Sequence, residues 1–200
     1  MNYEKDYNWN RLLHAYGFAT NTPEQLKNFF AVDEKLIIKA NDHLYSAVIH
    51  QETIYSVTPV VVKIFIEALS DPKHVLYTHD RLFDVLYFLE YAGISLSWQI
   101  ELMGEDYELM PPPTPEKVNA HFDCDEDDIK WGSLVCAWLM EKAVYDMLLM
   151  AAHVIKTIHP FTTSENSEIQ KIATKAIAQW TKAIETAPPV LGQALNGNID

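Results

Sequence analysis

The sequence predicts an all-α protein built from antiparallel pairs of helices. In nearly every segment, apolar residues recur at three- and four-residue steps, which is the spacing of a helix with one buried face. No segment sustains the alternation of apolar and polar residues that is typical of a strand. Short breaks separate the expected helices, and short connections make neighbouring helices antiparallel. With 200 residues and 48% apolar content, the chain can bury one sizeable core as a single domain over residues 1–200.

Residues 9–93 are expected to hold the N-terminal helix pairs. Thr22 is a suitable N-cap for the first helix, with Pro23 in its first turn. Asp33 can cap the second helix, which should continue to about His50. The buried faces of these two helices would contain Leu26, Phe29 and Phe30, and then Leu36, Ile37, Ala40, Leu44, Ala47 and Val48.

A third and a fourth helix complete this part of the chain. Ser56 or Thr58 can cap the third, Pro59 suits its first turn, and the segment "SDP" ends it. The fourth should run from about Asp80 to Gly93, because glycine can adopt the left-handed conformation that closes a helix. Helix pairs of this kind cannot bury their apolar faces alone and stack on their neighbours, which predicts a short α-solenoid.

An acidic, proline-rich insert is expected over residues 94–124. It contains "GEDYELMPPPTPEKVNAHFDC", in which four prolines within five residues favour an extended path over a helix. A C-terminal helix pair should follow over residues 125–187. Its first helix would run from about Asp127 to Ile158 with a possible break near Gly132, and its second would end at Pro188-Pro189. Residues 188–200 form a tail that we expect to be frayed.

Part of this pattern resembles a known family. The segments "LLHAYGFATNTPEQLKNFF" and "HLYSAVIHQETIYSVTPVVVKIFIEAL" are similar to the start of a group of bacterial HEAT-repeat-like proteins. The likeness covers roughly residues 9–92 and implies a HEAT- or armadillo-like α-solenoid of helix pairs. It implies no reaction, because members of the group are mostly uncharacterised, with toxin-neutralising or scaffold roles proposed for them.

Charge limits the partners that the chain can bind. The net charge is −13, and residues 101–130 contain ten acidic and two basic residues, a net charge of −8. No cluster of Lys and Arg offers the basic face that a nucleic acid requires. The acidic segment instead attracts a basic protein. We therefore expect a non-enzymatic binding module for such a partner, of the type of an immunity or antitoxin protein that inhibits a nuclease-like toxin.

The residues expected to bind this partner lie in or beside the insert. Aromatic residues among charges can anchor an interface, and exposed acids steer a basic partner toward it. The predicted set comprises the acids Glu105, Asp106, Asp125, Glu126, Asp127 and Asp128 and the anchors Tyr107, Phe122 and Trp131. Two alternatives stay open. The rings could instead pin a solvated loop to the helices, or the carboxylates from Asp123 to Asp128 could serve a hydrolase on the same scaffold.

A cluster of polar residues, His50, Gln51 and Thr53, separates the second and third expected helices. We interpret it as a structural joint, because its side chains fall where the last carbonyls of one helix and the first amides of the next need partners. A catalytic interpretation would need a nucleophile or a second carboxylate nearby. The sequence has no Gly-rich phosphate loop and no helical zinc motif, so no catalytic residue, metal or cofactor is predicted.

Two features concern the compartment. No stretch reaches the ~18 uninterrupted apolar residues of a membrane helix, and the start "MNYEKDYNWN" lacks the pattern of a secretory signal. We therefore expect a cytoplasmic protein with no membrane partner. Cys124 and Cys136 form neither a disulfide framework nor a metal knuckle, so both are expected to be free thiols.

Overall fold

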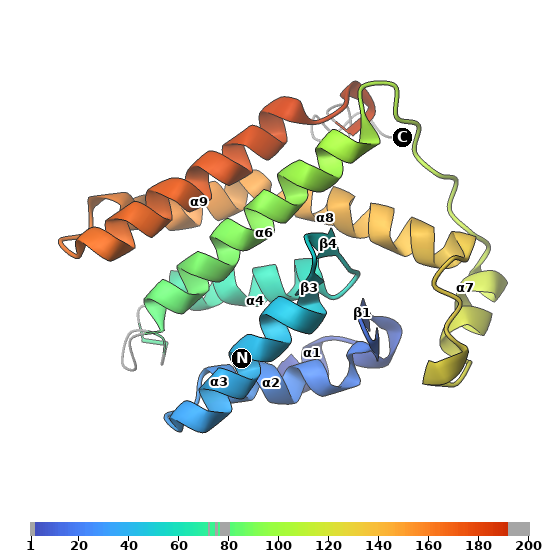
Figure 1. Ribbon diagram of the computed structural model, residues 1–200, viewed down its shortest axis with the longest axis horizontal. Coiled ribbons are helices and arrows are strands. Elements are labelled where there is room, and N and C mark those ends of the chain that lie inside the picture. The colour runs from blue at the N-terminus through green and yellow to red at the C-terminus, as the bar shows by residue number, and fades with distance from the viewer. Residues whose placement is uncertain (1–2, 72, 75, 77–80, 192–200) are drawn as a thin grey trace.

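The computed structural model describes residues 3–71, 73–74, 76 and 81–191. Of these residues, 72% lie in helices and 4% in strands, which confirms the all-α prediction. The helices are α1 (Tyr3–Asp6), α2 (Thr22–Phe29), α3 (Glu34–His43), α4 (Thr58–Ser70), α6 (Leu82–Met103), α7 (Pro115–Phe122), α8 (Leu134–Ile158) and α9 (Ser167–Thr186) (Figure 1). Two short antiparallel hairpins pair β1 (Leu13–His14) with β2 (Gly17–Phe18) and β3 (Ile49–His50) with β4 (Thr53–Ile54). The tail from residue 192 onward lies outside the described residues.

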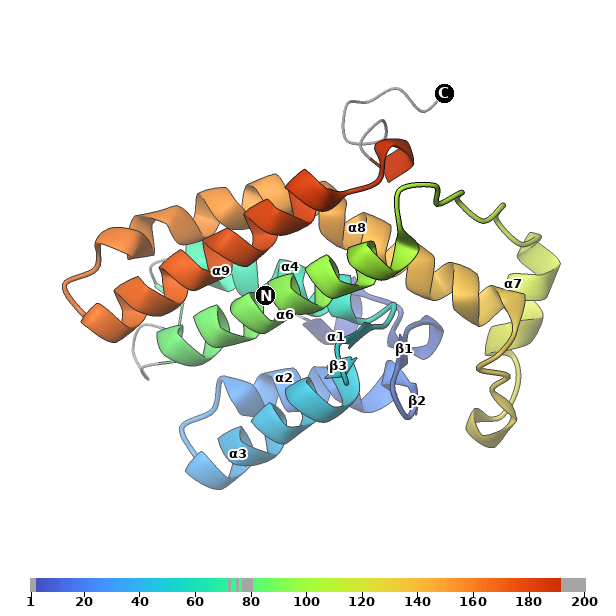
Figure 2. The same cartoon turned by 45° about the horizontal axis from the view of Figure 1, so that its top comes forward.

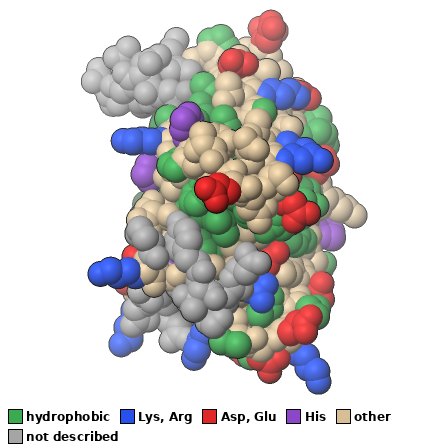
Figure 3. Space-filling model, turned by 90° about the vertical axis from the view of Figure 1, so that its left-hand side faces the viewer, with side chains coloured by type: hydrophobic (Ala, Val, Ile, Leu, Met, Phe, Trp, Pro, Cys, Tyr) green, Lys and Arg blue, Asp and Glu red, His purple; other side chains and the backbone are tan. Residues whose placement is uncertain are grey.

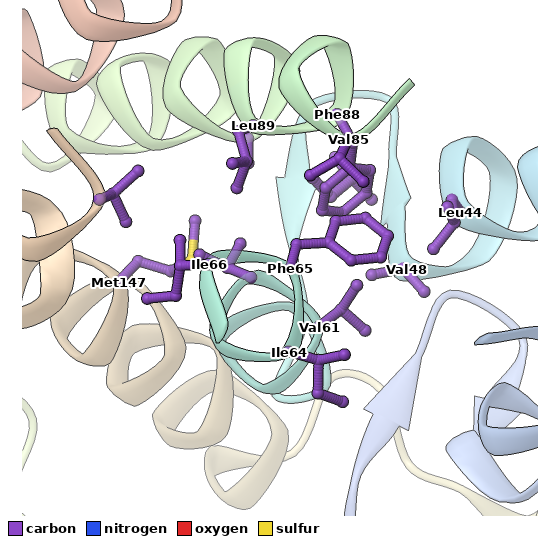
Figure 4. Close-up of a cluster of buried hydrophobic side chains, with 14 of the residues drawn as sticks. Leu44, Val48, Val61, Ile64, Phe65, Ile66, Val85, Phe88, Leu89 and Met147 are labelled. Atoms are coloured by element: carbon purple, nitrogen blue, oxygen red, sulfur yellow. The ribbon is translucent and has the colours of Figure 1, made fainter. Parts of the chain in front are cut away.

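The helices stack in two layers around one large apolar core. Helices α3, α6 and α9 form the front layer in Figure 1, while α4 and α8 lie behind. Within the layers, α6 packs along α9 and α4 packs on α8. Phe65 of α4 lies beside Phe88 of α6 between the layers (Figure 4), and its ring is 5.1 Å from those of both Phe88 and Phe29. Replacing a fully buried aromatic residue of this kind with alanine typically lowers the free energy of unfolding by about 3–5 kcal/mol.

Helix α6 is longer than predicted, because Gly93 does not end it. A β-carbon added at Gly93 would lie 2.9 Å from Gln179 Cβ and 3.0 Å from Trp180 Cδ1. The glycine thus permits the close approach of α9, and the buried Trp180 ring donates its Nε1 hydrogen to Leu89 O at 2.8 Å. The helix ends at Met103, followed by Gly104 with φ 75°. The predicted start near Asp80 lies outside the described residues.

The insert is therefore shorter than residues 94–124. After a turn at residues 105–106 the chain runs without helix or strand to Thr114, and Pro115 opens α7 instead of continuing this path. Proline is tolerated there because the first residue of a helix needs no N–H partner. The buried carboxylate of Glu141 holds the part before Pro115, accepting hydrogen bonds from the Tyr107 hydroxyl and from Met110 N at 3.1 Å.

The helix starts agree with the sequence in some places and differ in others. Asp33 caps α3 as predicted, with Oδ1 accepting from Lys35 N at 2.9 Å. Thr22, however, is already the first residue of α2, where Asn21 holds the N-cap position. The helix predicted from about Asp127 begins only at Leu134, after Ser133, whose side chain accepts from Cys136 N, and residues 126–128 form a separate 3-10 turn.

The joint between α3 and α4 is a β-hairpin, so the second helix does not reach His50. Helix α3 ends at His43, a π-helical turn follows over Leu44–Val48, and the chain then pairs β3 with β4. Its two turn residues, Gln51 and Glu52, have φ 48° and 62°, the left-handed values that a two-residue hairpin turn requires.

The side chains expected to cap α4 serve other backbone groups. Val57 holds the N-cap position, without a side-chain cap. Thr58 Oγ1 donates to Val48 O at 2.6 Å and accepts from Tyr55 N at 3.0 Å, so Thr58 links the end of the π-helical turn to the start of α4. Ser56 Oγ accepts from Leu13 N at 2.8 Å.

No helix in the described part of the chain combines the length and the hydropathy needed to cross a membrane.

Candidate partner-binding surface

The two hairpins lie side by side and are joined by backbone hydrogen bonds. Ala15 N donates to Ala47 O at 2.9 Å, and Val57 N donates to Leu13 O at 3.2 Å. These backbone bonds tie the first hairpin to the segments on either side of the second. Two loops far apart in the sequence therefore present one surface.

Four aromatic side chains gather on this surface, and we call them the aromatic patch: Tyr16, His50, Tyr55 and Trp131. The Tyr16 ring lies 5.7 Å from His50, and the Tyr55 ring lies 6.2 Å from Trp131. Burial raises the pKa of the Tyr55 phenol, a hydrogen bond with Thr53 opposes this, and the nearby Tyr16 phenol adds to the rise. Tyr16 is 60% exposed and Trp131 is 40% exposed, so a partner can reach the patch.

The acidic turn η4 (Glu126–Asp128) lies against the first hairpin. Glu126 Oε1 accepts from Phe18 N at 3.0 Å, and a β-carbon on Gly17, which has φ 137°, would lie 2.1 Å from the same oxygen. Glu126 therefore fastens the turn, which differs from the steering role predicted for it. Asp125, Asp127 and Asp128 are exposed and form no salt bridge within the described residues.

The remaining acids of the predicted set lie elsewhere. Glu105 and Asp106 are exposed directly after α6, whereas residues 125–128 lie near β1 and β2, at the other end of the insert (Figure 1). The structure thus separates the predicted acids into two groups. Only the group at residues 125–128 adjoins the aromatic patch.

Two of the three predicted anchors hold the insert to the rest of the protein. Tyr107 donates to Glu141, and burial together with this bond raises the pKa of its phenol. Phe122 packs 6.0 Å from Phe18, with the Arg11 guanidinium 5.1 Å from its ring centre. These contacts match the alternative of a loop pinned by rings. Trp131 is the anchor whose ring stays accessible, and its partner role remains a prediction.

Of the predicted joint residues, Thr53 and His50 take part in the surface. Thr53 contacts Tyr55, and half-buried His50 contacts Tyr16. Gln51 is exposed at the hairpin tip. Sequence reasoning missed Tyr16 and Tyr55. Their position beside glycine- and threonine-containing turn segments was the available signal, but it does not show that the two turns meet.

Two histidines, the buried His14 and the half-buried His43, lie beside the first hairpin. Tyr16 N donates to His14 Nδ1 at 3.2 Å, so His14 Nε2 carries the proton and donates to Asn21 Oδ1 at 3.0 Å. The His43 ring lies 5.4 Å from His14, and its Nε2 is 3.0 Å from Thr22 Oγ1. Burial, and then the neighbouring His14, lower the pKa of His43 to about 4. His43 is therefore neutral at pH 7, and Thr22 is fully buried, so this arrangement favours packing.

An open pocket of about 640 Å³ adjoins the acidic turn between α7 and α8. Its lining includes His121, Cys124, Asp128 and Leu134. His121 Nε2 lies 3.4 Å from Cys136 Sγ, and burial lowers the pKa of His121 and raises that of Cys136, which favours a neutral imidazole beside a thiol. Both cysteines are free, as predicted. Leu134 is 76% exposed, so the pocket offers an apolar contact next to the acids.

The carboxylates from Asp123 to Asp128 do not assemble a metal site in this arrangement. Within the described residues, no group of three or more His, Cys, Asp or Glu side chains converges closely enough to hold a metal ion.

No family model matches the chain, and no curated protein or solved structure is significantly similar to it.

Proposed function

We propose that the chain is a non-enzymatic protein-binding module that holds a basic protein on the aromatic patch and the acidic turn beside it. The observation that carries this proposal is the placement of the exposed Trp131 and Tyr16 next to Asp125, Asp127 and Asp128, three carboxylates without a salt bridge in the described residues. Aromatic anchors beside unpaired charge are the usual elements of a specific interface. A nuclease-like toxin, which is basic because its substrate is acidic, fits this surface.

The scaffold that we propose for this surface is a short HEAT-like α-solenoid. In support, α3, α6 and α9 form one layer and α4 and α8 lie behind it (Figure 2). The contacts α6–α9 and α4–α8 link successive helix pairs within each layer, as stacked repeats do. Such scaffolds present extended surfaces to other proteins.

The test measures association with the partner captured from a lysate of the source cells. Asp125→Asn, Asp127→Asn and Asp128→Asn together should slow association about ten-fold at low salt and flatten its salt dependence, because the acids steer the encounter. Trp131→Ala should speed dissociation about ten-fold, because it removes an anchor. The control combines Glu34→Gln, Glu165→Gln and Glu185→Gln, which are exposed acids elsewhere with the same change in charge. An acidic partner, or equal rates for the two triple variants, would refute the proposal.

A further inference from the structure

The outward side of α6 carries large apolar side chains from Phe83 to Leu102, with the exposed Glu101 beside them near the end of the helix. Four of the eleven large hydrophobic side chains exposed in the described part of the chain lie on this helix, with exposed fractions of 38% (Phe83), 48% (Tyr87), 38% (Trp98) and 64% (Leu102). Half-buried Tyr91 and Ile94 lie between them in the sequence. We call these six residues the α6 face. Their three- and four-residue steps keep them on one side of the helix, as a stripe about 28 Å long.

The α6 face is preformed and uncovered. The Phe83 and Tyr87 rings stack at 6.1 Å with 9° between their planes. The Tyr45 ring, from the turn after α3, lies 5.8 Å from Tyr87 and 5.6 Å from Tyr91. The opposite side of α6 packs on α9 and α4, and no described element lies over the outward side in Figures 1 and 2. A contiguous apolar surface of this size is typical of an interaction site.

The charges on α6 favour a basic partner. The helix contains Asp84, Glu90 and Glu101 and no Lys or Arg. Each carboxylate has one cation nearby: Arg81 at 3.0 Å, Lys175 at 3.8 Å and Lys182 at 2.6 Å, respectively. The Glu101–Lys182 pair is about half-exposed on both sides, and an exposed pair contributes little and can be exchanged for a partner's cation, whereas Glu90 is buried.

Acidity increases along the helix toward the insert. At the end of the molecule where α6 begins, hydrophobic side chains reach the surface among charges of both signs (Figure 3). At its other end, Glu101 is followed by the exposed Glu105 and Asp106. The cationic end of a bound segment would therefore meet residues 101–106.

We propose that the α6 face binds one amphipathic helix of a partner, with an apolar stripe along the six residues and Lys or Arg side chains at residues 101–106. A straight apolar stripe on a helix fits a second helix of similar length, which is a common mode of recognition. Exposed aromatic rings also attract cations. The inference rests on the proposed function, since it takes the partner to be basic. A second copy of the chain fits less well, because each copy carries a net charge of −13.

The test titrates the whole protein with a synthetic helix of Leu and Lys of about 20 residues, which spans about 30 Å. A counterpart with Glu in place of Lys serves as the second probe, and calorimetry measures both. The wild type should bind the Leu/Lys helix at least ten-fold more tightly than the Leu/Glu helix. Tyr87→Ser and Trp98→Ser should each weaken binding at least ten-fold, because they remove exposed aromatic anchors. Leu149→Ser, at a residue of α8 that is 46% exposed, is the matched control and should change binding less than two-fold.

The same titration separates this inference from the proposed function. The triple variant at Asp125, Asp127 and Asp128 should bind the Leu/Lys helix within two-fold of the wild type. If the triple variant alone loses the probe, the inference fails and the acidic turn keeps its proposed role. The inference is also overturned if the wild type and the variants at Tyr87 and Trp98 bind the Leu/Lys helix with equal affinity, or if the wild type binds the two probes with equal affinity. A wild-type dimer in sedimentation velocity that Trp98→Ser dissociates would assign the face to a second copy instead.

Discussion

Replacing His43 with asparagine should remove a large part of the pH dependence of stability between pH 6.5 and pH 4. Burial and then His14 lower the pKa of His43 from 6.5 to about 4 in the folded protein. The unfolded chain therefore binds more protons within this interval, and the free energy of unfolding falls as the pH drops. The contribution of His43 is complete above pH 6.5 and has been lost by about pH 4, below which both states are protonated.

The size of the effect follows from the difference between the two pKa values. One pKa unit corresponds to about 1.4 kcal/mol, so a pKa lowered from 6.5 to about 4 contributes about 3 kcal/mol over the interval. Asparagine does not titrate and retains a side chain that can hydrogen-bond to Thr22. The curve of His43→Asn should therefore be flatter than that of the wild type.

Urea unfolding followed by circular dichroism at half-unit steps from pH 7.5 to pH 3.5 provides the measurement. Carboxylates and other histidines titrate in the same interval, so the difference between the two proteins is the informative quantity. His153→Asn, at an exposed position of α8, controls for the loss of a histidine as such. If the wild-type and His43→Asn curves run parallel from pH 6.5 to pH 4, His43 does not control this pH dependence and the reasoning is wrong.

Three further substitutions test the packing that positions the surface. Gly93→Ala should lower the free energy of unfolding, measured in the same urea experiment, by about 1–2 kcal/mol, because the added β-carbon would overlap α9. Gly132→Ala, whose β-carbon would meet open space, should change it by less than about 0.5 kcal/mol. Glu141→Ala should speed proteolysis within residues 104–114 and lower the free energy of unfolding by about 1–3 kcal/mol, because the Tyr107 hydroxyl and Met110 N lose their acceptor. Glu108→Ala, which removes an exposed acid of the same segment, should change neither quantity. Gln51→Gly should leave the melting temperature unchanged or raise it, because glycine adopts φ 48° without strain. A clear fall in the melting temperature would instead support the predicted role of the Gln51 side chain as a hydrogen-bonding partner of the helix ends.

Local patterns were sufficient to place most helices. The prolines at residues 188–189 predicted the end of the helix that is α9, and Asp33 predicted the start of α3, because helix ends and caps depend on neighbours in the sequence. The same signals misled at Gly93. A glycine at that point is compatible with a helix end or with a close approach of another helix, and only the position of α9 distinguishes the two.

The sequence alone determined the helical class and the acidity of the insert, and it offered Trp131 as one of three candidate anchors, whose accessibility the structure decided. Tertiary structure decided which residues share a surface, since Tyr16, Tyr55 and Trp131 come from three separate segments. It also assigned Glu126, Tyr107 and Phe122 to holding the insert, and it lowered the pKa of His43. The physical reason is that helix periodicity is a property of adjacent residues, whereas burial, hydrogen bonding and Coulomb interactions depend on distances in space between segments far apart in the chain.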